Sequence, residues 1–353
     1  MLLRSIERRL VELASWDLEE PPIYMAWGRG RRIPLLKTLL SSCCRNSCYY
    51  CAIRRERRVL SRGGWNPERL VRVTLELWRR GVIKGFFLSS GMFGDPERVV
   101  ELQVEVARRL RERGYTGYIN LRLMPGTPRW LVWEAAEVAD RIGVNLESLS
   151  RDVFYDIAPD KGDYLRDLLD VLREAAAARD VLRREGALRA GIATQVIVGL
   201  GETDREVIEG TFSLLREVRP ARVYYSPFTP VPDTPLEGHP PCSRARARRL
   251  YQAFFLMRDY GFTPEDFECL LDDGDMLASV DDLKEAYAKA NRDEYPVDLN
   301  SASLKEMLRV PGIGPRIARE LLRIRSERRV RPEDVRRLAG PARARKILRY
   351  VSF

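Results

Sequence analysis

The stretch LLKTLLSSCCRNSCYYCAIRR (residues 35–55) joins an apolar run to a loop that holds four of the six cysteines of the chain. The run at 35–42 is typical of a buried strand that ends where the polar loop begins. Cys44, Cys48 and Cys51 follow it at the spacing C-x3-C-x2-C. Thiolates are soft ligands that suit iron and zinc. The pattern therefore predicts a metal-binding loop at the end of a strand.

Strand-like runs and amphipathic helical stretches alternate along the following two hundred residues. The further strand-like runs are at 84–91, 117–124, 143–150, 190–199 and 221–228, and the helical stretches are at 66–80, 95–113, 128–140, 163–186, 204–218 and 243–259. Such alternation is typical of βα units on a parallel sheet. We therefore predict an α/β fold, while periodicity alone leaves open whether the sheet closes into a barrel.

The composition excludes several classes of protein. The chain has 353 residues and a single histidine, His239, which argues against a Ser-His-Asp triad and a His-ligated zinc enzyme. No run reaches the roughly 18 apolar residues that a membrane span needs. Residues 4–15 have a helical rhythm with acidic residues, unlike a signal peptide, and the clustered cysteines are unlike a secreted disulfide framework. We expect a cytoplasmic protein.

The positive charge is concentrated at the C-terminal end. The net charge is +10, and residues 297–353 contain 15 Lys and Arg against 6 Asp and Glu, a net +9. A nearly neutral body with a basic tail indicates that the tail contacts a polyanion. Compositional bias is the alternative, because 54 of the 61 basic residues are Arg.

The metal in the cysteine loop is predicted to be an iron–sulfur cluster. A structural zinc site completes four protein ligands, commonly from two C-x2-C pairs. The other cysteines are Cys43, which is adjacent to Cys44, and the isolated Cys242 and Cys269. Three thiolates can instead hold three irons of a [4Fe–4S] cluster and leave the fourth iron open. Structural zinc and unrelated buried cysteines are the alternatives.

With Tyr50 as its aromatic residue, the motif C-x3-C-x-aromatic-C after the first strand resembles that of the radical SAM superfamily. The resemblance implies that S-adenosylmethionine binds the open iron and is cleaved by one electron to a 5′-deoxyadenosyl radical. It also implies a partial (β/α)6 barrel, with the chemistry at the C-terminal ends of the strands.

The resemblance also implies which residues contact S-adenosylmethionine. Ser89-Ser90-Gly91 stands where the superfamily often has a Gly-Gly-Glu-like stretch, but lacks the acid, and 199–203 resembles its G-x-G-E-T segment. An ordinary strand-to-helix turn capped by Thr203 is the alternative for the latter. The predicted contacts are Tyr50, Ser89, Ser90, Gly91, Asn145, Glu147, Gly199, Gly201, Glu202 and Thr203.

Basic side chains near the predicted strand ends are further candidates. We expect a phosphate-binding rim after the cysteine loop, with a solvated charged face as the alternative, at Arg54, Arg55, Arg57 and Arg58. Arg122 and Arg151 are candidates for pairing a carboxylate of the cofactor. No residue is assigned as the hydrogen donor or acceptor of the reaction.

The basic tail contains VPGIG (310–314) between two helical stretches and resembles a helix-hairpin-helix element. The apolar residues Leu304, Leu308, Ile317 and Leu321 support it through their helical spacing. The resemblance implies DNA binding through backbone phosphates, with contacts at Gly312, Ile313, Gly314, Arg316, Arg319 and Arg323. A protein-docking helical domain is the alternative.

The ordered phrases VNLESLSRDVFYDIAPDKG (144–162), VYYSPFTPVPDTPL (223–236) and DLKEAYAKANRDEYPVDLN (282–300) resemble a family of DNA modification or repair radical SAM proteins. Its reaction is unassigned, and the resemblance implies a uracil-DNA-glycosylase-like partner and an electron donor. The implied parts are an N-terminal helical extension (1–34), the radical SAM (β/α)6 core (35–260), a connecting segment (261–296) and a helix-hairpin-helix nucleic-acid-binding domain (297–353). RNA (tRNA) modification and a non-catalytic iron–sulfur nucleic-acid-binding protein are the alternatives.

Overall fold

The computed structural model describes residues 22–353 except 29 and 58–61. The helix predicted at 4–15 lies outside the described residues. The chain forms two compact units. The first comprises the residues up to Gly201 together with Arg216–Cys242, and the second comprises Glu202–Leu215 and Ser243–Phe353.

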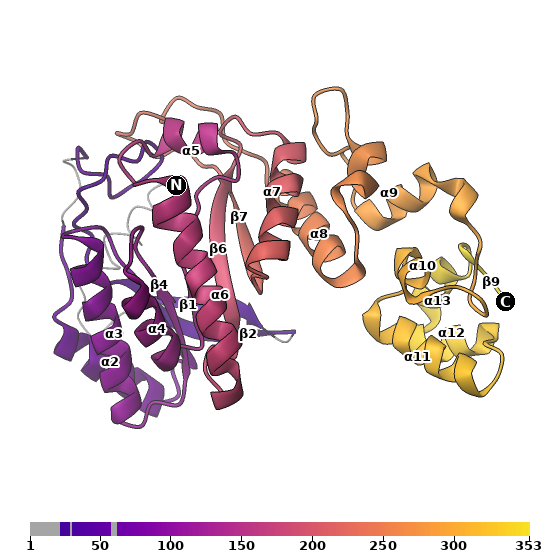
Figure 1. Cartoon of the computed structure of the whole chain (residues 1–353), viewed down its shortest axis with the longest axis horizontal. Helices are drawn as coiled ribbons and strands as arrows, with labels where there is room; N and C mark the ends of the chain where they lie inside the picture. The colour runs from indigo at the N-terminus through magenta and orange to yellow at the C-terminus, as the bar shows by residue number, and fades with distance from the viewer. Residues whose placement is uncertain (1–21, 29, 58–61) are drawn as a thin grey trace. The chain divides into compact units, whose positions relative to one another are not determined.

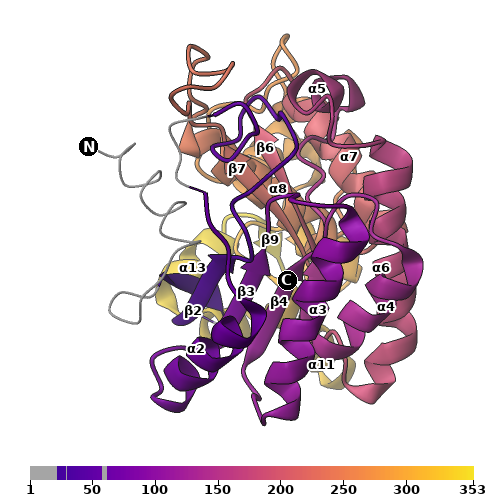
Figure 2. The same cartoon turned by 90° about the vertical axis from the view of Figure 1, so that its left-hand side faces the viewer.

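The first unit contains a seven-stranded sheet whose strands lie in the order of the sequence (Figures 1 and 2). The strands are β1 (Ile23–Gly28), β2 (Arg31–Leu39), β3 (Gly85–Ser89), β4 (Tyr118–Arg122), β5 (Arg141–Gly143), β6 (Gly191–Val198) and β7 (Arg222–Pro227). β1 is antiparallel to β2, and the other neighbours are parallel. β1 and β7 do not pair, so the curled sheet is an open, partial barrel, as predicted.

The helices of the first unit connect successive parallel strands. They are α2 (Pro67–Arg79), α3 (Pro96–Glu112), α4 (Arg129–Val138), α5 (Arg151–Ile157), the π-helical turn η1 (Tyr164–Leu169), α6 (Asp170–Leu182) and the 3₁₀ turn η2 (Arg183–Glu185). Asn66 and Asp95 cap α2 and α3, and each is followed by a proline in the first helical turn. This is the cap chemistry that starts a helix at a defined residue.

The two faces of the sheet differ in burial. Residues on the face covered by α2, α3, α4 and α6 are fully buried (Figure 2), for example Leu36, Phe86, Ile119 and Ile142 at 0% exposure. The alternate positions point to the concave face and carry polar, charged and aromatic side chains. One row across the hydrogen-bonded register consists of Lys37, Phe87, Asn120 and Arg141. The alternation follows from the two-residue period of a strand.

The strand predicted at 143–150 lies earlier in the chain, at Arg141–Gly143. After Gly143 the chain leaves the ladder, and Glu147 adopts a left-handed backbone with φ of 63°. Glu147 returns to the sheet only as an isolated bridge to Val196 on β6. The apolar run therefore marked a buried segment correctly but misplaced the strand.

The second unit is helical. Its elements are α7 (Asp204–Glu217), α8 (Arg244–Tyr260), η3 (Pro264–Leu270), α9 (Leu283–Ala290), η4 (Arg292–Glu294), β8 (Val297–Asp298), α10 (Leu304–Arg309), α11 (Pro315–Glu327), α12 (Pro332–Ala339), α13 (Pro341–Ile347) and β9 (Val351–Ser352). The last two residues of α7 fall in the first unit. β8 and β9 pair in parallel and join the two ends of residues 297–353.

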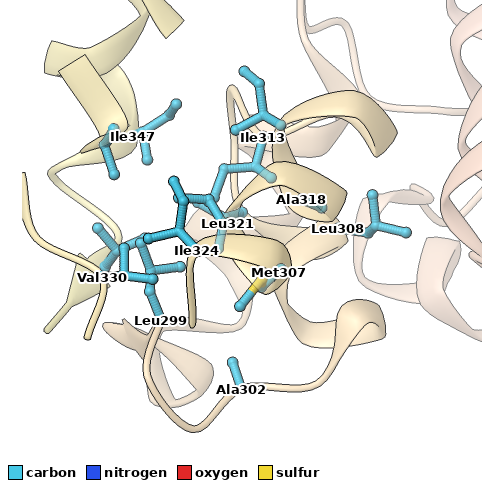
Figure 3. Close-up of a cluster of buried hydrophobic side chains, with 14 of the residues drawn as sticks. Leu299, Ala302, Met307, Leu308, Ile313, Ala318, Leu321, Ile324, Val330 and Ile347 are labelled. Carbon is cyan, nitrogen blue, oxygen red and sulfur yellow. The ribbon is translucent and has the colours of Figure 1, made fainter. Parts of the chain in front are cut away.

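Residues 297–353 enclose a core of their own (Figure 3). It includes Met307, Leu308, Ile317 and Leu321, whereas Leu304 is 40% exposed and does not belong to it. The expectation that helical spacing marks core residues was therefore correct for Leu308, Ile317 and Leu321 and wrong for Leu304.

The segment predicted to connect the core to the tail packs against the tail. Arg309 of α10 pairs with Asp266 at 2.7 Å, and Lys346 of α13 pairs with Asp282 at 2.7 Å. The guanidinium of Arg309 also lies 4.3 Å from the ring centroid of Phe262. These contacts hold residues 261–296 to the tail.

No helix in the described part of the chain has the length and the apolar run that crossing a bilayer requires.

Candidate functional site

The cysteine loop follows β2 and lies against the residues that follow β3. The Gly91 N–H donates to the Ser41 carbonyl at 2.7 Å, and the Arg45 N–H donates to the Met92 carbonyl at 2.7 Å. A Cβ atom at Gly91 would lie 2.2 Å from the Cys43 carbonyl oxygen. Only glycine allows the loop to approach so closely, so Gly91 positions the cysteines.

The thiols of Cys44, Cys48 and Cys51 act on one another electrostatically. Burial raises the pKa of Cys48 to about 11, and the neighbouring Glu147 and Cys44 add to the rise while Lys161 opposes it. Burial and the nearby Cys48 raise the pKa of Cys51 to about 12. Thiols in such surroundings need positive charge to ionise, which the iron of a bound cluster would supply.

Three sulfurs on one loop are a donor set that suits an iron–sulfur cluster. The described residues contain no group of three or more His, Cys, Asp or Glu side chains already arranged to hold a metal ion. The Met92 N–H already donates to the Cys44 sulfur at 3.4 Å, as thiolate ligands commonly accept. Cys269 is exposed, and the Cys242 side chain packs against Gly199.

A buried ion pair borders the cysteine loop. Lys161 Nζ donates to the Glu147 carboxylate and, at 3.3 Å, to the Tyr50 hydroxyl. The side chains of Lys161 and Glu147 are only 13% and 4% exposed. Burial alone would lower the pKa of Lys161, but the charge of Glu147 and the nearby thiols raise it above its usual value. Lys161 therefore keeps its positive charge beside the thiols.

Lys161 is a site residue that the sequence analysis missed. Lys161 lies fourteen residues after Glu147, within the stretch 144–162 that carried the family resemblance. The resemblance could therefore have indicated this residue, but no role was assigned to it. The left-handed backbone of Glu147 also supports a functional position, because strain of this kind concentrates at functional sites.

The other predicted contacts at the strand ends are placed as follows. The Ser89 carbonyl accepts the Leu40 N–H at 2.7 Å, so this oxygen is engaged within the sheet. The Ser90 hydroxyl donates to the Gly91 carbonyl at 2.8 Å. Asn145 has a buried side-chain oxygen with no hydrogen-bond partner among the described residues. Such an orphaned acceptor is typical of a position that meets a ligand or water.

In the G-x-G-E-T segment, the side chains of Glu202 and Thr203 contact other residues of the protein. Gly199 and Gly201 have φ values of 98° and 122°. The Thr203 hydroxyl accepts the Glu206 N–H at 3.2 Å, and Glu206 accepts the Thr203 N–H at 2.8 Å. This is the capping box that the alternative interpretation predicted for Thr203. The Glu202 carboxylate is buried and pairs with Arg246 at 3.0 Å.

The basic rim predicted after the cysteine loop is not formed by Arg57. That side chain is 4% exposed and donates to the carbonyls of Ala52 and Pro232. Arg54 and Arg55 both form ion pairs with Glu56. One carboxylate therefore offsets one of their two positive charges, which leaves less positive charge for a ligand. Arg58 lies outside the described residues.

The two candidates for a cofactor carboxylate differ in burial. Arg151 is exposed at the start of α5. Arg122 is buried at the end of β4 and donates to the Ala193 carbonyl.

The predicted hairpin is a tight turn between α10 and α11. The Ile313 N–H donates to the Val310 carbonyl at 3.0 Å, and Gly312 has a φ of 92°. Ile313 is 1% exposed, and its N–H and carbonyl are both hydrogen-bonded within the protein, so the predicted ligand contact at Ile313 has no free group there. A Cβ atom at Gly312 would lie 2.8 Å from Ile347 of α13, so glycine is required for packing as well as for conformation.

The three predicted arginines lie on the exposed side of α11. Arg316 and Arg319 form no ion pair with described residues, whereas Arg323 pairs with Glu320 and Glu327. Arg316 and Arg319 therefore retain charge for a polyanion, and Arg323 retains less.

A groove of about 460 Å³ borders the hairpin. Gly312, Ile313 and Gly314 line one side, and Lys284, Tyr260 and Arg343 are among the side chains that complete it. Lys284 donates to the Ile313 carbonyl at 2.5 Å, which fixes the hairpin against α9. The groove therefore combines backbone groups of the turn with two basic side chains and two acidic ones, Asp281 and Asp282.

Comparison with known proteins agrees with the fold and the cysteine loop. Residues 38–210 match the family model of the radical SAM superfamily. An uncharacterised protein of Methanocaldococcus jannaschii, MJ0785, is 25% identical over 131 residues, which is 36% of this chain and 32% of that protein. The FeFe-hydrogenase maturase HydG from Carboxydothermus hydrogenoformans superposes with a TM-score of 0.51 and 19% identity, over 64% of this chain and 51% of that chain. The chain thus spans about a third of the curated relative and about half of HydG.

The open, partial βα barrel and the three-cysteine loop after its first parallel strand define the class of protein. The match over residues 38–210, just under half of the chain, supports a radical SAM superfamily domain in this stretch. This family implies S-adenosylmethionine and a [4Fe–4S] cluster as cofactors. The fold similarity to HydG concerns the architecture alone.

Proposed function

We propose that this protein is a radical S-adenosylmethionine enzyme that acts on a base or sugar of DNA. The observation that carries the proposal is the set of three electrostatically coupled thiols beside the buried Lys161–Glu147 pair, in a chain that also has a basic helical tail. The matched family supports the cofactor chemistry. The charge and geometry of the tail support the choice of substrate.

In this proposal Cys44, Cys48 and Cys51 hold the cluster. When bound, the cluster and S-adenosylmethionine together supply a 5′-deoxyadenosyl radical that abstracts hydrogen. Lys161 balances part of the negative charge of the thiolates and of Glu147. Its contact with the Tyr50 hydroxyl fixes that ring beside the loop.

The remaining polar groups at the strand ends would orient the cofactor. Asn145 offers an unpartnered acceptor. The backbone from Ser89 to Gly91 would replace the missing acid of the superfamily motif. Gly199 and Gly201 let the chain turn sharply at the end of β6, and Glu202 and Thr203 hold that turn through Arg246 and the cap of α7.

The tail would bind the DNA backbone. Arg316 and Arg319 are exposed cations on α11, and the N–H groups at Gly312 and Gly314 lie at the turn before the helix. Contacts of this kind bind phosphate with little sequence preference and weaken steeply with salt. Chemistry on a base further requires that the nucleotide leaves the helical stack. The family resemblance adds an electron donor and a uracil-DNA-glycosylase-like protein as proposed partners.

The cofactor chemistry is tested with full-length protein, reconstituted with iron and sulfide without oxygen. Dithionite and S-adenosylmethionine should yield 5′-deoxyadenosine and methionine, and the reduced protein should give the electron paramagnetic resonance signal of a cubane. Cys44→Ala, Cys48→Ala and Cys51→Ala should lose both, whereas Cys269→Ala, an exposed cysteine outside the loop, should keep both. Bound zinc, or product formation by the Cys48→Ala variant, would contradict the assignment.

The DNA proposal is tested by fluorescence anisotropy over a series of salt concentrations. Arg316→Gln with Arg319→Gln should weaken DNA binding and reduce the salt slope by up to about 2. Arg336→Gln removes an exposed charge of the same domain that pairs with Glu333 and serves as the matched control. Tighter binding to RNA than to DNA under the same salt would favour RNA modification instead. Equal binding by all variants would favour the protein-docking alternative.

A further inference from the structure

The concave face of the sheet carries cations from three strands. Lys37 lies on β2, Arg122 on β4 and Arg141 on β5, and all three face away from the helix layer. Lys37 and Arg141 are half-buried, while residues on the opposite face of the same strands are fully buried. The described residues therefore leave the concave face partly open to solvent.

Aromatic rings separate these cations. Lys37 Nζ lies 4.9 Å from the ring centroid of Tyr24 and 5.1 Å from that of Phe87. Arg122 Cζ lies 5.8 Å from the same Phe87 ring and 5.6 Å from the Tyr224 ring. The Phe87 ring thus contacts both cations. Ring faces offset part of the cost of burying a cation but do not neutralise its charge.

The cations lack carboxylate partners. Lys37 and Arg122 form no ion pair among the described residues, and the carboxylate whose charge reaches Arg122, that of Glu147, is already paired with Lys161. Arg141 is satisfied by the Ala190 carbonyl at 2.7 Å and by the Tyr224 hydroxyl at 3.1 Å. Within the described part of the chain, Lys37 and Arg122 are therefore the two members whose charge has no counterion.

A polar group without a partner lies on the same face. Asn120 shares its register row with Lys37 and Phe87, is 3% exposed, and has a side-chain oxygen with no hydrogen-bond partner in the described structure. Buried amides are normally satisfied, and this oxygen is an acceptor, so it indicates a water or an N–H or O–H group of a ligand rather than the anion itself.

Gly143 makes the position of Arg122 possible. A Cβ atom at Gly143 would lie 1.8 Å from the Ala193 carbonyl oxygen and 3.1 Å from a terminal nitrogen of Arg122. The guanidinium therefore passes over the space that a side chain would occupy. β5 carries the one residue type that leaves this path open.

We propose that the concave face binds an oxyanion of the substrate, either a phosphate or a carboxylate, through Lys37 and Arg122, with the Asn120 oxygen accepting from an N–H or O–H group of the same substrate. This inference rests on the proposed function, because it places the substrate within the partial barrel. Lys37 lies two residues before the end of β2, about 6–7 Å below the level from which the cysteine loop departs. That depth favours the substrate over the carboxylate of S-adenosylmethionine.

The electrostatics agree with an unfilled anion site. Burial lowers the pKa of Lys37, and the charge of Arg122 lowers it further. Burial likewise lowers the pKa of Arg122 to about 10, with Arg141 contributing and Tyr224 opposing. A bound oxyanion would relieve this repulsion and restore both pKa values toward their usual range.

The test measures anion binding to the full chain, with and without its cluster, by isothermal titration and thermal denaturation. The probes are inorganic phosphate, acetate and thymidine 5′-monophosphate, with thymidine as the uncharged control. At least one anion should bind and raise Tm with concentration. Lys37→Met and Arg122→Met should each weaken its binding at least about tenfold. Lys84→Met, an exposed lysine just before β3, should leave it unchanged.

The different probes distinguish between the possible sources of the anion. Preference for phosphate and thymidine 5′-monophosphate would assign a nucleotide phosphate, and preference for acetate would assign a carboxylate. Lys37→Arg should retain binding, which separates loss of charge from loss of folding. Competition between the anion and S-adenosylmethionine would assign the site to the cofactor and overturn the proposal, as would equal binding by Lys37→Met and the parent. Anion binding without cleavage of S-adenosylmethionine would instead refute the proposed function and leave this site standing.

Discussion

Replacing Arg246 by Met tests whether the acidic residue of the G-x-G-E-T segment acts on the cofactor or on the fold. The Arg246 guanidinium contacts Glu202 Oε1 at 3.0 Å and Asp204 Oδ1 at 2.7 Å, and both carboxylate side chains are 1% exposed. It also donates to the Glu202 carbonyl at 2.8 Å. Asp204 would keep the Leu277 N–H at 2.9 Å as a donor. Arg246→Met would thus remove the cation that both buried carboxylates contact.

The expected loss of stability is about 3–5 kcal/mol, the usual cost of breaking a buried ion pair. That is a large part of the roughly 5–15 kcal/mol by which a native protein is stable. Urea unfolding of reduced, cluster-free protein, followed by circular dichroism, measures it. Arg244→Met, an exposed residue at the start of the same helix, should change the free energy of unfolding by less than about 0.5 kcal/mol.

Two further variants decide the role of the carboxylate. Combining Arg246→Met with Glu202→Gln and Asp204→Asn should recover part of the loss, because neutral amides cost less to leave unpaired. The reasoning is refuted if Arg246→Met stays within about 1 kcal/mol of the parent while Glu202→Gln alone abolishes binding of S-adenosylmethionine. In that case the carboxylate would serve the cofactor directly.

Two other predictions concern backbone approach and pH. Gly143→Ala should lower Tm strongly, because its Cβ would lie 1.8 Å from a carbonyl oxygen, whereas Gly94→Ala, with no atom within 4 Å, should be neutral. Burial, together with the nearby Lys346 and Arg309, lowers the pKa of Lys284 from 10.5 to about 7, although Asp282 opposes the shift. Between pH 7 and 10.5, Lys284 is protonated in the unfolded chain and neutral in the folded chain, so the free energy of unfolding should rise with pH across this window. Below pH 7 Lys284 is protonated in both states, and the full cost of burying its charge applies. At about 1.4 kcal/mol per pH unit the change amounts to a few kcal/mol. Lys284→Met should lack this slope in urea unfolding measured from pH 6 to 10, and an unchanged slope would refute the assignment.

Local pattern predicted the order of the parallel strands and their helices, but it missed β1, which is a strand where a helical extension was expected. Each parallel strand was preceded or followed by the expected helix, and the start of α2 was visible in Asn66 and its following proline. Caps and two-residue or 3.6-residue periods depend on neighbours within a few positions, so they can be inferred from the chain alone. The spacing of Cys44, Cys48 and Cys51 is local in the same sense and predicted the class of domain.

Local pattern failed where a residue's environment comes from a distant strand or helix. β5 begins earlier than its apolar run suggested, because Glu147 leaves the ladder in a left-handed conformation. Arg57 seemed to be part of an exposed basic run but is buried against the carbonyl of Pro232, 175 residues further along the chain. Leu304 matched the helical pattern but faces solvent.

The sequence by itself determined the βα succession, the three-thiol loop and the basic tail, since these depend on residue type and spacing along the chain. Only the tertiary structure decided that Lys161 pairs with Glu147 and that Lys37 and Arg122 share the Phe87 ring on one face. Such groups meet through strand register and long connections. A shift of one residue in register would send Lys37, Phe87 or Arg122 to the opposite face of the sheet.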